Sequence, residues 1–209
     1  MNYKMIGRFT AQTLLVETLF MIPALLISLF SREAAAVSGF LYTIALLILV
    51  TGILWLPCRK APRAMGAREG LVCVSLSWMA MSLLGCLPFV FSGAIPHYID
   101  ALFEIVSGFT TTGSSILARP EDLPNGILYW RSFSHWLGGM GVLVFLLALS
   151  PGDGKGSGFT MHLLRAESPG PDVGKLVPKM RKTATILYLI YIVLTALNIL
   201  FLLAGGMSL

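Results

Sequence analysis

The fold of this chain is decided by the stretch Ser107-Gly108-Phe109-Thr110-Thr111-Thr112-Gly113-Ser114-Ser115. It lies between two strongly apolar segments and is too polar to span a membrane itself. Threonine is β-branched and favours extended backbone, and Gly113 can adopt a positive φ at no steric cost. The pattern predicts a loop that enters the bilayer and returns. Its extended strand, residues 110–113, would turn backbone carbonyls toward an ion path.

The composition is that of an integral membrane protein. Of the 209 residues, 56% are hydrophobic and 12% are charged, about half the charge of a typical soluble domain. The net charge of +5 could indicate a nucleic-acid partner. The basic residues gather in the loops of one side of the membrane, however, so we predict the lipid bilayer and no nucleic acid as the partner.

Five segments are long and apolar enough to cross a bilayer as helices. They are residues 9–30, 39–56 (closed by Pro57), 71–91, 127–149 and 183–204. Residues 99–109 would form a helix of about half a bilayer, which indicates a re-entrant pore helix. The predicted fold class is an all-α membrane protein with five transmembrane helices, a re-entrant pore helix and a filter loop.

The charges predict the orientation. Twelve of the 15 lysines and arginines fall in the loops of one side, and the other side carries only Arg32, Arg119 and Arg131. Basic residues concentrate in cytoplasmic loops. We therefore expect a multi-pass protein of the inner or plasma membrane with its N-terminus in the cytoplasm and the pore loop entering from outside.

Several motifs along the chain resemble one transporter family. Asp100-Ala101-Leu102-Phe103-Glu104, followed by the stretch quoted above, is similar to the first pore loop of TrkH-type potassium transporters of the Trk/Ktr/HKT superfamily. Further matches are Trp130-Arg131, Trp136-Leu137-Gly138-Gly139-Met140-Gly141 and Arg165-Ala166-Glu167-Ser168-Pro169-Gly170-Pro171. The resemblance runs across the whole chain.

The resemblance implies potassium uptake through a carbonyl-lined selectivity filter made of Thr110, Thr111, Thr112 and Gly113, with the ion at the last three. In the family, four pore units of one polypeptide surround the path, so this chain would supply the first quarter. The implied partners are a cytosolic nucleotide-binding gating subunit and a second copy of the full-length protein. The alternative is a truncated, non-conducting membrane fragment with a structural or assembly role.

The predicted organisation has four parts. Residues 1–60 form an N-terminal two-helix extension, and residues 68–150 form the first pore unit of span, pore helix, filter and span. Residues 151–182 form a cytoplasmic loop, and residues 183–209 are the first span of a second, incomplete pore unit. The chain is therefore expected to be an N-terminal fragment or a truncated gene product.

Five residues are predicted to support the filter: Asp100, Glu104, Ser107, Gly108 and Arg131. Asp100 is placed to cap the pore helix. Glu104 could add negative potential near the entrance or hold the filter by accepting hydrogen bonds. Arg131 is expected to extend toward the outer surface, with pairing to Glu104 as the alternative.

Other polar residues leave less specific signals. Glu17 lies near the middle of the first span and is either a functional acid or a neutral or paired side chain at a helix contact, which we favour. The glycines near Met140 indicate close helix approach. Neither the histidines nor the cysteines form a ligand set, and the cysteines are interpreted as small buried residues: Cys58, Cys73 and Cys86. No nucleophile is arranged with a base, so we predict neither an enzyme nor a cofactor.

Overall fold

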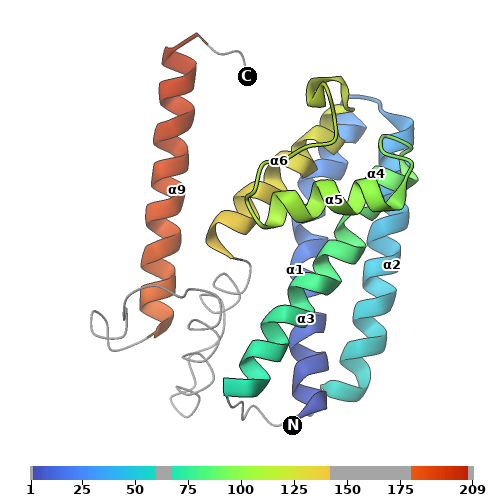
Figure 1. Ribbon diagram of the computed structural model, residues 1–209, viewed down its shortest axis with the longest axis vertical. Coiled ribbons are helices and arrows are strands. Elements are labelled where there is room, and N and C mark those ends of the chain that lie inside the picture. Colours follow the sequence, from blue (N-terminus) through green and yellow to red (C-terminus); the bar gives the residue numbers. More distant parts are fainter. Residues whose placement is uncertain (1, 60–66, 142–179, 207–209) are drawn as a thin grey trace.

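The computed structural model describes residues 2–59, 67–141 and 180–206, and every regular element in these ranges is a helix (Figure 1). Helices α1, α2 and α3 run side by side, and α5 crosses their upper part (Figure 1). Helix α6 descends obliquely past the end of α5 (Figure 1). The all-α fold class is therefore confirmed.

The two-helix extension is an antiparallel pair. Helix α1 comprises Tyr3–Phe30 and helix α2 comprises Ala34–Cys58. Arg32, in the short turn between them, has a left-handed backbone with φ +57°. The sequence predicted that Pro57 closes the second span, but Pro57 lies inside α2, which ends one residue later. Both helices are longer than predicted because they extend past the apolar cores of their segments.

The predicted third span is interrupted at Cys86. Helix α3 comprises Ala67–Gly85, and the short helix α4 comprises Leu87–Phe91. Pro88 lies at the start of α4 and has no N–H to donate to the preceding turn. The Phe89 N–H, which would meet the Gly85 carbonyl in a continuous α-helix, donates to the Cys86 carbonyl at 3.1 Å. The carbonyl of Gly85 accepts a hydrogen bond from Trp130 Nε1 at 2.8 Å. The break in the helix therefore supplies an acceptor for an indole from α6.

The helix predicted as the pore helix is short and amphipathic. Helix α5 comprises Tyr98–Phe109, 12 residues, or about 18 Å of helix, a little over half a bilayer core. Its buried positions include Ala101, Glu104, Ile105 and Gly108, at the spacing of one helix face. The predicted half-length helix is thus present, and it begins one residue before the predicted boundary.

Helix α6 comprises Asn125–Met140 and follows a short 3₁₀ helix, Pro120–Asp122. Gly141 closes α6 with φ +74°. The predicted fourth span, residues 127–149, is therefore observed only in part, because residues 142–149 lie outside the described ranges. Most of the predicted loop 151–182 also lies outside them.

Helix α9 comprises Met180–Ala204 and packs against α6 through polar contacts. The Trp136 indole donates to Thr195 Oγ1 at 3.1 Å, and the Tyr191 hydroxyl donates to the Trp136 carbonyl at 3.1 Å. Four helical segments of the described chain are long and apolar enough to cross a membrane: Tyr3–Phe30, Ala34–Cys58, Glu69–Phe91 and Thr185–Ala204. The remaining predicted span, the fourth, corresponds to α6, whose described part is shorter.

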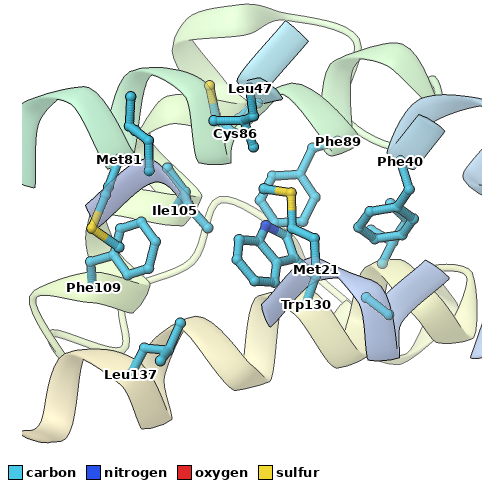
Figure 2. Close-up of a cluster of buried hydrophobic side chains, with 14 of the residues drawn as sticks. Met21, Phe40, Leu47, Met81, Cys86, Phe89, Ile105, Phe109, Trp130 and Leu137 are labelled. Carbon is cyan, nitrogen blue, oxygen red and sulfur yellow. The ribbon is translucent and has the colours of Figure 1, made fainter. Parts of the chain in front are cut away.

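The apolar core lies among helices α1 to α6, all of which contribute buried side chains to it. Its fully buried side chains include Met21, Phe89 and Trp130, drawn in Figure 2. The Trp130 and Phe109 rings meet edge to face with centroids 6.5 Å apart. Phe109 is the last residue of α5. The core therefore holds the pore helix at the end from which the candidate loop departs.

Candidate functional site

The loop after α5 begins with a left-handed helix cap. The Thr112 N–H donates to the Ser107 carbonyl at 3.0 Å, and the Thr111 N–H donates to the Gly108 carbonyl at 2.9 Å. These two bonds form the Schellman pattern, in which the residue after the cap has a left-handed backbone. Thr111 adopts it, with φ +57°. A β-branched residue rarely does so, and the backbone at Thr111 is therefore strained.

The prediction of an extended strand is wrong at its first two residues. Thr110 is helical, with φ −85° and ψ −1°, and Thr111 is left-handed. The cap forms in place of extended backbone because its two bonds give partners to the Thr111 and Thr112 N–H groups, which an extended strand would leave unpaired. Gly113 has φ +76°, the positive value that its lack of a side chain allows. Left-handed backbone therefore occurs at Thr111 and again two residues later.

The threonine hydroxyls bond within the loop. Thr110 Oγ1 donates to the Val106 carbonyl at 2.8 Å and lies 2.8 Å from Thr112 Oγ1. Thr111 Oγ1 donates to the Thr110 carbonyl at 2.7 Å. The side chains of residues 110–116 are exposed. The loop is thus held by its own backbone and hydroxyls and presents one side that the described residues do not cover.

Glu104 joins the returning limb of the loop to α5. Its Oε1 accepts from Ser115 Oγ at 2.9 Å, and its Oε2 accepts from the Ile116 N–H at 3.2 Å. Ser107 adds a second tie, because its hydroxyl donates to the Ser114 carbonyl at 2.6 Å. Of the two predicted roles of Glu104, the structure shows the one in which it accepts hydrogen bonds from the loop.

Arg131 pairs with Glu104 and does not extend to the outer surface. Its Nε lies 2.5 Å from Glu104 Oε1, and the two side chains are 14% and 0% exposed. The favoured interpretation of Arg131 is therefore wrong, and the alternative is correct. A buried carboxylate needs a partner, and the guanidinium supplies one from the first turns of α6.

Asp100 is not the cap of α5. The helix begins at Tyr98, and the capping position belongs to His97, which makes no side-chain cap bond. Asp100 lies in the first turn instead. A carboxylate there complements the positive end of the helix dipole. The predicted cap is wrong because the helix starts three residues earlier than an Asp100 cap requires.

Helices α5 and α6 approach each other closely at two glycines. A Cβ added to Gly108 would collide with Ser134 Oγ, and one added to Gly138 would overlap the Phe109 carbonyl. The Gly138 site also lies against backbone atoms of the last turn of α5, with the Phe109 carbonyl carbon at 2.8 Å and the Gly108 oxygen at 3.0 Å. The sequence predicted close helix approach at Gly138 without naming the partner helix, and it made no such prediction for Gly108.

Glu17 lies at the contact between α1 and α3. It is fully buried, and neither carboxyl oxygen has a hydrogen-bond partner among the described residues. A Cβ added to Gly85 would meet Glu17 Oε1, and it would lie 3.4 Å from the Phe109 ring. The favoured reading, a side chain at a helix contact, agrees with this position, but the described residues provide no pairing.

Three residues that contribute to the site were not predicted from the sequence. Ser115 and the Ile116 N–H bind Glu104, and Trp130 fixes the end of α3. Ser115 and Ile116 follow a glycine loop and belong to no pattern that predicts their bonds to Glu104. Trp130, next to Arg131, could have predicted the contact between α6 and the end of α3. The described residues contain no group of three His, Cys, Asp or Glu able to hold a metal. All three cysteines are free and buried, as predicted.

Comparisons with known proteins agree on one family. The family model for TrkH, described as a cation transport protein, matches residues 37–206. The chain is 37% identical over 210 residues to the Trk system potassium uptake protein TrkH of Escherichia coli K12, covering 100% of this chain and 43% of that protein. Its counterpart from Halomonas elongata is 36% identical over 210 residues, with the same two coverages.

A solved structure agrees with the sequence comparisons. The crystal structure of the potassium transporter TrkH from Vibrio parahaemolyticus superimposes with a TM-score of 0.77 at 30% identity, covering 98% of this chain and 40% of that chain. This chain therefore spans less than half the length of these relatives. The four apolar helices and the matched family together indicate a multi-pass membrane protein. The chain belongs to the TrkH family of cation transport proteins.

Proposed function

We propose that this chain supplies the first quarter of a potassium uptake path, in which carbonyls of residues 110–113 replace water around the ion. The observation that carries the proposal is the left-handed backbone at Thr111 and Gly113. In extended backbone, neighbouring carbonyls point to opposite sides. A change of hand at alternate residues brings them to one side, as a carbonyl cage requires. The relatives named as potassium uptake proteins support the choice of ion.

The frame around the loop supports a selective site. Discrimination between potassium and sodium depends on the number and placement of the carbonyls. The loop is tied at its start by the helix cap and on its return by Ser107 and Glu104. Helix α5 ends at Phe109, with Thr110 as its C-terminal cap, so the negative end of its dipole faces the loop and favours a cation.

Thr111, Thr112 and Gly113 hold the ion in this proposal, with Thr110 at the inner end. The uncovered side of the loop is where the other three quarters of the family's architecture would stand. Residues 68–150 then form the first pore unit, residues 1–60 the extension beside it, and residues 183–209 the start of the second unit.

The proposed orientation places the N-terminus in the cytoplasm. Lys4 and Arg8 lie in the first two turns of α1, which begins near the end marked N at the bottom of Figure 1, and the Arg8 guanidinium donates to the carbonyl of Arg59, just after α2, at 3.3 Å. Arg32 lies in the turn at the opposite end of this helix pair. That asymmetry favours a cytoplasmic lower end. A cytosolic nucleotide-binding gating subunit would meet this basic end, and the full-length protein would form a homodimer.

Replacing Gly113 by serine tests the proposed filter. At φ +76° a side chain costs roughly 1 kcal/mol or more, and rotating the peptide to relieve that strain turns a carbonyl away from the path. We expect Gly113→Ser to relax potassium selection more than it lowers expression. The measurement is rubidium uptake with and without competing sodium, in a full-length transporter that carries residues 1–209.

Gly93 provides a matched control. It has φ +74° and, like Gly113, open space where a Cβ would be placed, but it lies in the turn before α5. Gly93→Ser therefore introduces similar backbone strain away from the loop, and it should leave sodium competition unchanged. Unchanged competition in Gly113→Ser at equal membrane expression would remove Gly113 from the ion path.

A further inference from the structure

We infer that Gly138 of α6 is a positioning residue for the ion path: it holds the carbonyl end of α5, and with it the filter loop, in place. This inference rests on the function proposed above and extends it to a residue outside the loop. Gly138 makes no contact with the ion in this scheme. It acts through the backbone of α5.

A side chain at Gly138 would meet backbone atoms of α5. At the position of a Cβ on Gly138, the Phe109 carbonyl carbon would be 2.8 Å away and the Gly108 carbonyl oxygen 3.0 Å away, and the Phe109 oxygen would be overlapped. Carbon atoms pack at about 3.5–4.0 Å. A methyl group therefore forces the last turn of α5 and α6 apart by roughly 1 Å, since a backbone carbonyl cannot rotate aside as a side chain can.

The last turn of α5 is directly connected to the filter. Two hydrogen bonds join its carbonyls at Ser107 and Gly108 to the N–H groups of Thr112 and Thr111. Any shift of this turn is passed to the loop through those bonds. The Glu104 ties hold the returning limb to an earlier turn of α5. The loop would therefore be distorted between a moved start and a fixed return.

The neighbouring glycine faces a different partner. A Cβ added to Gly139 would meet the hydroxyl of Tyr191 on α9, the movable end of a side chain. One added to Gly52 of α2 would meet nothing within 4 Å. A methyl group would therefore meet the α5 backbone at Gly138, the Tyr191 side chain of α9 at Gly139, and open space at Gly52.

The experiment compares Gly138→Ala, Gly139→Ala and Gly52→Ala in a full-length transporter that carries residues 1–209. Rubidium uptake is measured over a range of sodium concentrations at equal membrane expression. We expect sodium to compete about tenfold better in Gly138→Ala, a change of about 1.4 kcal/mol in relative affinity. The other two variants should stay within about twofold of the parent. Parent-like competition in Gly138→Ala, or an equal effect in Gly139→Ala, overturns the inference.

A second pair of variants decides the matter if Gly138→Ala does not reach the membrane. The obstacle to a side chain at Gly108 is the Ser134 side chain, whose Cβ lies 3.0 Å from the added atom. Gly108→Ala should relax selection, and adding Ser134→Gly should restore it by removing the obstacle. Rescue of selectivity is a result that loss of stability alone would not give. Unaltered competition in Gly108→Ala contradicts the inference.

The outcomes separate this inference from the function on which it rests. If Gly113→Ser relaxes sodium exclusion and Gly138→Ala does not, the filter stands and Gly138 has no positioning role. If neither variant alters sodium competition, the filter assignment itself fails.

Discussion

Thr111 has an unfavourable backbone conformation that its surroundings hold in place. Its φ of +57° is uncommon for any residue with a side chain and rarer still for a β-branched one. The hydrogen bonds of the helix cap hold it there. Strain of this kind persists only where the surrounding structure fixes it. In the proposed path, the strained residue is one whose carbonyl must point at the ion.

The Glu104–Arg131 pair gives a prediction at the same scale. Arg131→Met leaves the buried Glu104 carboxylate without its cation, and removing one partner of a buried pair costs about 3–5 kcal/mol. Because Arg131 is slightly exposed, at 14%, we expect the loss in the free energy of unfolding to lie near the lower limit of that range. Thermal unfolding of the purified protein measures it, with the exposed Arg119→Met as the control.

The double variant Glu104→Gln/Arg131→Met should recover part of that stability, because no uncompensated charge then remains buried. Strictly additive losses in the two single variants and the double variant would show that the two side chains are not coupled.

Sequence reasoning located these residues better than it predicted their conformations. It placed Glu104, Ser107 and Arg131 near the filter, because they accompany a recognisable loop motif. It expected positive φ at Gly113, where glycine makes that value easy, and missed Thr111, where the side chain opposes it. The pairing of Arg131 depended on the relative placement of α5 and α6, which local patterns do not encode.

Among the elements, α6 is held at its N-terminus by a residue that precedes α2. Glu33, in the turn between α1 and α2, accepts the Asn125 N–H at Oε1 (2.7 Å) and the Gly126 N–H at Oε2 (3.3 Å). These N–H groups begin α6 and have no partner within the helix. A carboxylate at this position also complements the helix dipole. The turn between α1 and α2 thus supports the start of α6 directly.

We predict that Glu33→Ala lowers the free energy of unfolding by about 1 kcal/mol, the usual cost of losing an N-terminal cap. Glu33→Gln should cost less, because its amide oxygen can still accept one of the two N–H groups. Equilibrium or thermal unfolding of the purified protein gives the comparison, with exposed Glu121→Gln as the control. Equal stability of the Ala variant and the parent would show that solvent replaces the cap.

This cap shows why element boundaries are only partly predictable. The acceptor lies 92 residues before the N–H that it binds, so no local pattern reveals it. The apolar runs predicted both ends of α5 and α9 to within three residues and the C-terminal ends of α1 and α2 to within two, because hydrophobic length is a local property. Helices α1 and α2 begin six and five residues before their predicted starts. The break at Cys86 was missed, since a proline can either kink a helix or begin a new one.

At the scale of the whole molecule, the charged helix ends predict how the protein lies in the membrane. Lys4, at the start of α1, is exposed, and so is Glu121 in the loop before α6. We expect a membrane-impermeant thiol reagent applied to intact cells to label Glu121→Cys. Lys4→Cys should be labelled only after the cells are permeabilised. The parent chain, whose described cysteines are buried, sets the background.

Labelling in the reverse order would invert the proposed orientation and place the filter loop on the cytoplasmic side. The helical packing would be unaffected, because the contacts of α1, α2 and α3 do not depend on which side faces the cytoplasm.

The unpartnered carboxyl of Glu17 has a consequence for how the protein is made. Gly85, against which it rests, is synthesised 68 residues later. Until then, α1 meets the lipid with an ionisable side chain near its middle, and such side chains cost about 2.5–3.5 kcal/mol during insertion. The ribosome must synthesise α3 before Glu17 of α1 can reach its buried position in the folded protein. Helices α1 and α3 are therefore linked during biogenesis, and the order of translation becomes part of how this membrane protein assembles.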